Sequence, residues 1–392
     1  MSTFPGGLDA ARRVLGERFG HSHLRVHQLR VLGPLLAGRS VLAVLPTGAG
    51  KSLCYQVPAL LARGLTLVVS PLISLMQDQV AALRRRGIAA AYLNSQLDAE
   101  QRRTVLTAAL EGRITLLYCA PERLGSLIPR LRATRTRVAL LAVDEAHCIV
   151  EWGNEFRPVY RRLGEYRYLL GDPPTIALTG SATPATRAAI LSVLRLSGRR
   201  AETIVTSFDR PNLRFAVGRI RDDRERFRAM REAIRHGDDG GEGASVVYAP
   251  TRRLTELVTR ALLRTSVRAA PYHAGLTAAV RRRVLRAFLA DRVPVIVATS
   301  AFGMGIDKPD VRRVLHWGPP RTLESYYQEA GRAGRDGRPA ECLLLWRPAD
   351  LAWGHIAPSM RRYVEARRCR RRILLEYFGE RARECSGCDV CG

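Results

Sequence analysis

The sequence contains almost no lysine. Among its 63 Lys and Arg residues, only Lys51 and Lys308 are lysines, so arginine carries nearly all of the positive charge. The preference for arginine over lysine is typical of a GC-rich genome. It does not explain why the basic residues outnumber the 36 acidic ones and leave a net charge of +27. A positive field of that size attracts polyanions, so the composition favours nucleic acid as the partner.

Long apolar segments are also missing. The longest apolar runs have the length of a strand, such as VALLAV at 138–143, and none is long enough for a membrane-spanning helix. The first residues, MSTFPGGLDAARRVLGERF, contain no apolar core followed by a small-residue cleavage site, so a signal peptide is not expected. We therefore expect an intracellular protein of the bacterial cytoplasm or nucleoid, with no membrane partner.

Disulfide bonds are not expected among the eight cysteines. Four of them lie inside or beside apolar runs, where a free thiol behaves as a small hydrophobic group: Cys54, Cys119, Cys148 and Cys342. The other four lie close to the C-terminus with the spacing C-x15-C-x2-C-x2-C, which is typical of a four-thiolate zinc site: Cys369, Cys385, Cys388 and Cys391. The segment RRCRRRILLEYFG predicts a helix that ends at Gly379, so one ligand comes from a helix and three from the loop after it. The alternative is four spare thiols.

The distribution of apolar runs predicts two α/β domains and a small tail. With 392 residues, 46% apolar and 25% charged, the chain is globular and long enough for two or three domains. Continuous apolar runs alternate with helical patterns, which indicates parallel sheets covered on both faces. These runs are 41–45, 66–70, 115–119, 138–144, 175–180, 245–249, 294–299, 313–317 and 342–346. We expect domains at 1–207, 208–346 and 347–392, with FDRPNLRF (208–215) as the linker between the first two.

The segment SVLAVLPTGAGKSLCYQ (40–56) reads as a strand, a glycine-rich turn and the start of a helix. The backbone N–H groups of such a turn can cradle phosphates, so Thr47, Gly48 and Gly50 are candidate nucleotide ligands. Lys51 would reach the β- and γ-phosphates, and Ser52 would hold Mg²⁺. The strict motif has glycine where this chain has leucine, six residues before the lysine, and the alternative is a turn that binds nothing.

A second candidate element follows a buried strand in LLAVDEAHC (140–148). Asp144 stands at the strand end, where a carboxylate can hold Mg²⁺ through water. Glu145 would then orient or deprotonate the attacking water. Together with a phosphate loop about ninety residues earlier in the chain, the pair indicates nucleotide hydrolysis.

Positive charge for the transferring phosphoryl group is available in ESYYQEAGRAGRDG (324–337). Gln328, Arg332 and Arg335 are spaced so that they share one helix face, provided that the helix continues past its two glycines. An arginine in such a place can act as an arginine finger. The alternative is a solvated arginine face.

The motifs in order resemble those of superfamily-two helicases, and more narrowly those of RecQ family DNA helicases. The segments that carry the resemblance are LPTGAGKS, VVSPLISLMQDQV, YCAPERL, DEAH, LTGSAT, YHAGL, VATSAFGMGIDKPDV and QEAGRAGRDG. The resemblance implies two RecA-like domains that close on ATP and Mg²⁺, followed by a small helical zinc-binding subdomain. It also implies an ATP hydrolase that moves 3′-to-5′ on single-stranded DNA and unwinds partly duplex DNA in repair or recombination. We expect it to act as a monomer.

The same resemblance assigns an adenine-reading role to FGHSHLRVHQ (19–28). Gln28 would bond the adenine edge with help from Arg25, and His21 would stack on the base in place of the family's aromatic ring. Val26 and His27 stand where the family has proline and glycine. This replacement affects the expected backbone conformation of the loop but not the assignment of Gln28.

The resemblance also assigns DNA coupling to CIVEWGNEFRPVY (148–160). Trp152, Phe156 and Arg157 would link DNA contact to the DEAH segment, because aromatic faces stack on any base without reading sequence. Asn154 replaces the family's usual histidine.

Three functional classes remain: a helicase, an ATP-driven translocase with little strand separation, and an inactive DNA-binding adaptor. The intact lysine, carboxylates and arginines argue against the adaptor. The printed sequence ends one residue after Cys391. We therefore expect no winged-helix domain, and strong single-strand-stimulated ATPase with weak, short-range unwinding.

Overall fold

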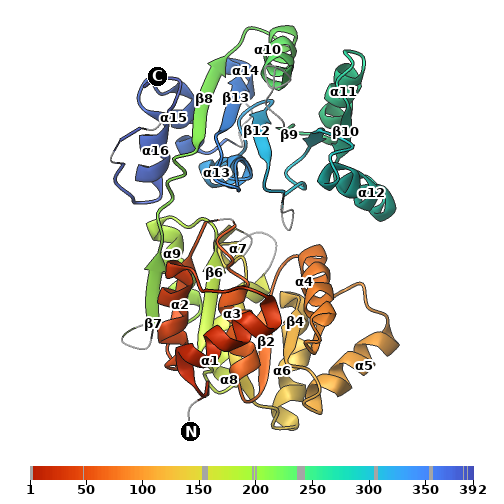
Figure 1. The fold of residues 1–392 in the computed structure, drawn as a ribbon, viewed down its shortest axis with the longest axis vertical. Helices are drawn as coiled ribbons and strands as arrows, with labels where there is room; N and C mark the ends of the chain where they lie inside the picture. The colour runs from red at the N-terminus through yellow and green to blue at the C-terminus, as the bar shows by residue number, and fades with distance from the viewer. Residues whose placement is uncertain are drawn as a thin grey trace. The chain divides into compact units, whose positions relative to one another are not determined.

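The computed structural model describes residues 3–46, 48–151, 158–196, 198, 201–235, 243–303, 308–352, 356–382, 384–385 and 387–392. The chain divides into two compact units, unit 1 (Met1–Ser207) and unit 2 (Phe208–Gly392). Each unit is built around its own parallel sheet (Figure 1).

The sheet of unit 1 has seven strands in the order β3-β4-β2-β5-β6-β1-β7. The strands are β1 (Ser40–Val44), β2 (Leu65–Val69), β3 (Ala90–Leu93), β4 (Leu116–Cys119), β5 (Val138–Val143), β6 (Thr175–Thr179) and β7 (Ala201–Val205). All of their pairings are parallel, so the carboxyl ends of the strands share one edge of the sheet. The central strands β1, β2, β5 and β6 are buried along their whole length.

Helices surround this sheet. They are α1 (Gly7–Val14), α2 (Val26–Leu36), α3 (Leu53–Leu61), α4 (Ile73–Arg85), α5 (Ala99–Leu110), α6 (Leu124–Ala133), α7 (Cys148–Glu151), α8 (Leu163–Leu169) and α9 (Pro184–Val193), with a π-helical turn at Leu15–Phe19 and 3₁₀ turns at Pro121–Arg123 and Pro158–Arg162. Apolar side chains of α1 to α4 pack in one cluster with alternate residues of the central strands. That packing fixes the positions of the loops that follow β1 and β5.

The sheet of unit 2 has six strands in the order β10-β11-β9-β12-β13-β8, again all parallel. The strands are β8 (Leu213–Arg219), β9 (Ala244–Tyr248), β10 (Ala269–Tyr272), β11 (Val295–Ala298), β12 (Val311–His316) and β13 (Ala340–Trp346). The helices are α10 (Asp223–Arg235), α11 (Arg252–Leu263), α12 (Ala278–Leu289), α13 (Leu323–Ala330), α14 (Pro348–Leu351), α15 (Pro358–Glu365) and α16 (Arg370–Tyr377).

Two hydrophobic clusters cover the two faces of the second sheet. On one face, Val247, Val297 and Leu315 pack with residues of α10 and α11. On the other, Val246 and Val314 pack with residues of α12, α13, α15 and α16. Residues from the C-terminal end of the chain therefore share the core of unit 2.

All nine strands that the apolar runs predict are present. The sequence missed β3, β7, β8 and β10, and these are the four edge strands of the two sheets. Residues 208–215, which were predicted to be a linker, are bonded into unit 2 instead. Arg210 and Asn212 donate side-chain hydrogen bonds to unit 2 carbonyls, and β8 already begins at Leu213.

Among the described residues, no helix is long and apolar enough to cross a membrane.

Candidate functional site

The glycine-rich turn of unit 1 lies between the buried strand β1 and helix α3. Gly48 and Gly50 have φ angles of 81° and 73°, in the left-handed region that favours glycine. The ammonium of Lys51 donates to the carbonyls of Leu45 and Pro46 at 3.3 and 3.4 Å, and so folds back over the turn. Leu45 stands where the motif has glycine, and its side chain is fully buried in the core. Thr47 lies outside the described residues.

The predicted adenine-reading segment holds this turn from the N-terminal side. Nη1 of Arg25 donates to the carbonyl of Gly48 at 2.8 Å, and the ring Nε2 of His27 donates to the carbonyl of Ala49 at 2.7 Å. The amide of Gln28 donates to Gly50 O at 3.2 Å and accepts from the Arg25 N–H at 2.9 Å. Three side chains of one helical turn therefore fix the backbone of the phosphate loop.

His27 is a residue whose role the sequence analysis missed. It appeared there only as a departure from the family's glycine, and no spacing signal pointed to the carbonyl that it contacts. His21, predicted to stack on the base, lies exposed just beyond the π-helical turn.

The two candidate carboxylates follow strand β5 directly. Asp144 is 5% exposed and accepts a hydrogen bond from the Glu145 N–H at 3.0 Å. Burial raises the pKa of Asp144 to about 7; the Glu145 charge adds to the rise and the Lys51 charge opposes it. Glu145 has a φ of 48°, a left-handed conformation that is uncommon for a residue other than glycine. Backbone strain of this kind concentrates at functional sites.

A histidine links the carboxylates to the next strand. Nδ1 of His147 lies 3.3 Å from Oε2 of Glu145 and 2.9 Å from Oγ1 of Thr179, at the end of β6. Thr179 in turn bonds the carbonyl and the N–H of Ser181 at 3.0 and 3.3 Å. The DEAH segment is therefore coupled to LTGSAT through buried hydrogen bonds. In the sequence, the one feature that pointed to this contact is that each segment follows an apolar strand.

The candidate arginines of unit 2 do not lie on one helix face. Helix α13 ends at Ala330, Gly331 is its C-terminal cap, and a series of turns follows. Gln328 is therefore helical, whereas Arg332 and Arg335 belong to what we call the arginine loop, residues 331–335. The condition for a shared face, a helix that continues past both glycines, is not met because the helix stops at the first glycine.

Arg332 is tied to another glycine of unit 2. Its Nη1 donates to the carbonyl of Gly303, and a Cβ at that position would lie 2.2 Å from Nη2 of Arg332. A side chain at position 303 would therefore displace the guanidinium of Arg332 from this position. The predicted DNA-coupling residues Trp152, Phe156 and Arg157 lie outside the described residues.

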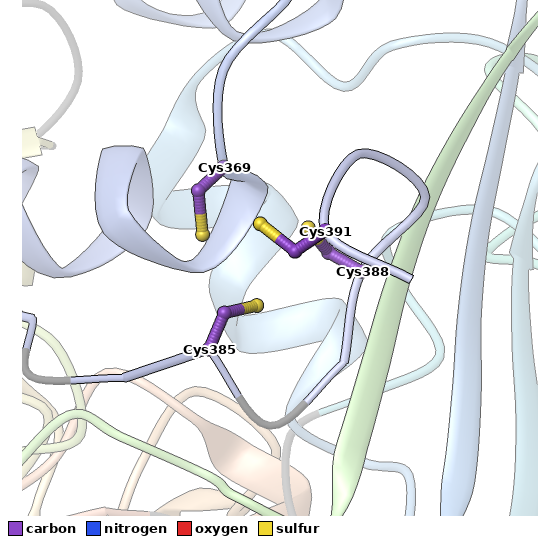
Figure 2. A group of neighbouring side chains, drawn as sticks. All are labelled: Cys369, Cys385, Cys388 and Cys391. Carbon is purple, nitrogen blue, oxygen red and sulfur yellow. The ribbon is translucent and has the colours of Figure 1, made fainter.

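The four C-terminal cysteines converge on one point (Figure 2). The sulfur atoms of Cys369, Cys385, Cys388 and Cys391 all lie within 4.8 Å of one another. Four sulfurs bound at about 2.3 Å to a tetrahedral zinc are about 3.8 Å apart, so this set fits the ion. Cys369 is the N-terminal cap of α16 rather than a residue inside it, and its sulfur accepts from the Arg372 N–H at 3.5 Å.

The loop that carries Cys385, Cys388 and Cys391, here called the cysteine knuckle, packs on β8, an edge strand of the second sheet. Cys388 forms a parallel bridge with Phe215 of β8, and the Asp389 N–H donates to Phe215 O at 3.0 Å. Burial raises the pKa of the Cys388 thiol, but backbone N–H donors, the first from Arg370, outweigh burial and lower it to about 7. A thiol of this kind is readily deprotonated for metal binding.

The four other cysteines are buried in the two cores, as predicted. Their exposed fractions are 0 to 1% at Cys54, Cys119, Cys148 and Cys342.

Known families match both units and the cysteine segment. A DEAD/DEAH box helicase family matches residues 25–190, a helicase conserved C-terminal domain matches 225–337, and a RecQ zinc-binding family matches 357–392. Together with the phosphate loop, the DEAH carboxylates and the two parallel sheets, these matches define a protein of the helicase class. The cysteine segment and the similarity to individual proteins narrow this class further: the chain belongs to the RecQ family.

Three curated relatives illustrate the similarity. The ATP-dependent DNA helicase RecQ of Haemophilus influenzae is 41% identical over 97% of this chain. The RecQ of Bacillus subtilis is 40% identical over 98% of this chain and 67% of its own length. A probable ATP-dependent DNA helicase, RecS, from the same bacterium is 40% identical over 88% of this chain and 68% of its own length. The chain spans 63% of the length of the Haemophilus influenzae relative.

Solved helicases share the fold at lower identity. The Mycobacterium smegmatis helicase Lhr, bound to single-stranded DNA and AMP-PNP, matches with a TM-score of 0.67 and 21% identity over 89% of this chain and 48% of its own. S. cerevisiae Dbp5, bound to RNA and ADP BeF3, matches with a TM-score of 0.68 and 16% identity over 92% of this chain and 93% of its own. These neighbours confirm two RecA-like domains.

Proposed function

We propose that the protein is an ATP-dependent DNA helicase that moves 3′-to-5′ on single-stranded DNA and unwinds partly duplex DNA. One observation carries the proposal. The phosphate loop and the DEAH carboxylates lie at the ends of central strands of one sheet, in a chain about 40% identical to curated RecQ helicases. Because those relatives are named as helicases, strand separation is favoured over the translocase alternative.

In the proposed reaction, Lys51 and the turn N–H groups of Gly48 and Gly50 bind the phosphates. Ser52 and Asp144 would hold Mg²⁺, which neutralises charge on the phosphate oxygens. The raised pKa of Asp144 means that an uncompensated charge is costly there, and a cation relieves that cost.

Glu145 orients the attacking water and accepts its proton, with His147 fixing the carboxylate. Arg332 and Arg335 stabilise the negative charge that develops on the transferring phosphoryl group, and Gln328 contacts the phosphates beside them. Gln28 and Arg25 read the adenine edge, and His21 stacks on the base.

DNA binding is assigned to Trp152, Phe156 and Arg157, the residues predicted to couple DNA contact to the DEAH segment. With a net charge of +27, binding should weaken steeply as salt rises, because arginines release counterions from the phosphates. We propose a monomer with domains at 1–207, 208–346 and 347–392, the last binding zinc. We place it in the bacterial cytoplasm, in DNA repair or recombination.

The test compares ATPase activity and strand separation on the same DNA. Single-stranded DNA should raise ATP turnover, and a duplex with a 3′ tail should be opened faster than the same duplex with a 5′ tail. ATPase without strand separation on either substrate would favour the translocase. Turnover that ignores DNA would reject both.

A further inference from the structure

The backbone of the arginine loop is hydrogen-bonded by one side chain, Arg210, which lies near the first residue of unit 2 in the sequence. Nη1 of Arg210 donates to the carbonyl of Gly331 at 3.2 Å. Its Nη2 donates to the carbonyls of Ala333 and Gly334 at 2.9 and 2.8 Å. A single guanidinium therefore fixes the backbone on both sides of Arg332, and its planar fork of donors is pre-organised for several acceptors.

A neighbouring amide adds a second grip. Nδ2 of Asn212 donates to the carbonyls of Gly334 and Arg338 at 2.8 and 2.9 Å. Gly334 has a φ of 55°, and a Cβ there would lie 2.4 Å from the Asn212 amide. The second glycine of the loop is thus favoured by its own conformation and by the Arg338 carbonyl, which would lie 2.8 Å from a Cβ there.

The gripping segment is itself held by the helix that starts at the cysteine cluster. Arg371, two residues after Cys369, is 1% exposed. Its Nη1 donates to the carbonyl of Arg210 at 2.9 Å and to the Asp209 carboxylate, and its Nη2 donates to the carbonyl of Leu213 at 2.6 Å. A buried charge with this many partners holds its surroundings in one arrangement.

We propose that Arg371 and Arg210 form a positioning relay that places the arginine loop for ATP hydrolysis. The relay makes turnover depend on the cysteine-bearing end of the chain, although that end carries none of the candidate nucleotide ligands. Neither residue touches substrate, and both act through Arg332 and Arg335. The inference rests on the catalytic role proposed above for those two arginines. A displacement of about 1 Å in a catalytic group can cost up to about a hundredfold in rate.

The experiment compares Arg210→Ala and Arg332→Ala with the control Arg214→Ala in the full chain. Arg214 lies on β8 four residues from Arg210, and its exposed side chain lies 3.6 Å from the Glu341 carboxylate. We measure kcat and KM for ATP at saturating DNA, affinity for ADP with and without aluminium fluoride, zinc content and melting temperature. Aluminium fluoride mimics the transferring phosphoryl group, so its binding reports on the arginines.

Arg210→Ala should lower kcat by roughly tenfold or more, with KM changed less than about threefold. It should weaken ADP–aluminium fluoride binding while the affinity for ADP and the zinc content stay at wild-type values. Arg214→Ala should match the wild type. In an Arg332→Ala background, Arg210→Ala should lower kcat by less than it does alone, because part of the group that it positions is gone.

Two further variants test the other contacts of the relay without removing the buried charge of Arg371. Asn212→Ala should show the same pattern with a smaller fall in kcat. Arg371→Lys keeps the charge beside Asp209 but loses the fork, so it should also lower kcat while ADP affinity holds.

Each alternative result overturns the relay in a different way. Wild-type turnover in Arg210→Ala beside an inactive Arg332→Ala rejects the relay and leaves the proposed function standing. Normal turnover in Arg332→Ala rejects the catalytic arginine and the relay together. A parallel loss of ADP binding, zinc and melting temperature in Arg210→Ala would make the residue a folding contact and nothing more.

Discussion

The two units hold their candidate catalytic residues in different ways. In unit 1, Lys51 and Asp144 follow central strands that are buried along their whole length, and their side chains bond the backbone of their own loops. In unit 2, the arginine loop follows the end of a helix. It is gripped by Arg210, at the start of the unit, which Arg371 in turn holds from near its end.

The candidate sites of the two units therefore depend on different parts of the structure. The site of unit 1 depends on a rigid parallel sheet, because each loop begins where a buried strand ends. The site of unit 2 depends on contacts of Arg210 with residues 121 to 124 positions later and with Arg371, 161 positions later. In our proposal it is therefore complete only when the C-terminal segment is folded. Changes at the cysteines should therefore affect the two units unequally.

The largest effect is expected from the strained residue of unit 1. Glu145→Gln should reduce ATP turnover by about a thousandfold while ATP still binds, because the water is no longer activated and the phosphate loop is unchanged. Steady-state turnover and equilibrium nucleotide binding check this. Glu202→Gln, at a partly exposed glutamate paired with Arg39 in the same unit, is the control and should turn over normally. Normal turnover in Glu145→Gln would remove the role proposed for that residue.

Loss of one zinc ligand should destabilise unit 2 more than unit 1. Cys385→Ser should lower the zinc content below one per chain and lower the melting temperature of unit 2 by roughly 10 °C, because structural zinc supplies folding free energy. Unit 1 should still bind nucleotide. Metal analysis and calorimetry check both statements.

Cys342→Ala is the matched control, since this thiol is buried in the core of unit 2 outside the cluster, and zinc should be retained. Equal destabilisation of the two units by Cys385→Ser would contradict the expectation that zinc stabilises unit 2 alone.

A smaller effect of opposite sign is expected at Asp144. Its folded-state pKa of about 7 lies above the ordinary value for aspartate near 3.9, so the folded protein binds the proton more tightly than the unfolded chain. Stability is therefore lost as the pH rises from about 4 to about 7, and the full cost remains above 7. Asp144→Asn should raise the melting temperature of unit 1 by several degrees at pH 8 without Mg²⁺, and by little at pH 4. A gain of equal size at both pH values would show that the carboxylate charge is not its source.

The smallest effect concerns nucleotide choice. Gln28→Ala should reduce the preference for ATP over GTP by a few fold, while hydrolysis survives, since the amide is proposed to read the adenine edge. His27→Ala also removes a hydrogen bond to the phosphate loop, so it should raise KM for both nucleotides equally. If the two variants shift the ATP to GTP ratio alike, Gln28 does not read the base.

The sequence predicted the central strands and missed the edge strands β7, β8 and β10 for one physical reason. A central parallel strand is buried on both faces and reads as a continuous apolar run, as in β5. An edge strand is only partly covered: no residue of β10 is fully buried, and β7 has only one. The cysteine spacing predicted the cluster in full, because three of its ligands are local in sequence.

The contacts that the sequence could not give all span long separations. His147 meets Thr179 only because β5 and β6 are neighbours, and no pattern in either segment states that pairing. Residues 208–215 look like a linker because the partners of Arg210 lie more than a hundred residues later. The shared face of Gln328 and the two arginines failed at Gly331, where the helix ends.

The knuckle on β8 has a consequence for solubility. The outer side of an edge strand offers free N–H and C=O groups that can pair with another chain. Here Cys388 and Asp389 occupy part of that edge, and the Asp389 carboxylate also accepts from the Val217 N–H at 3.0 Å. Chelating the metal would release this cover and expose a row of unpaired backbone groups. Metal-depleted protein should therefore self-associate through this edge at temperatures below its unfolding, and light scattering during chelation would detect it. Bound zinc would thus also prevent edge-to-edge pairing between copies of the protein.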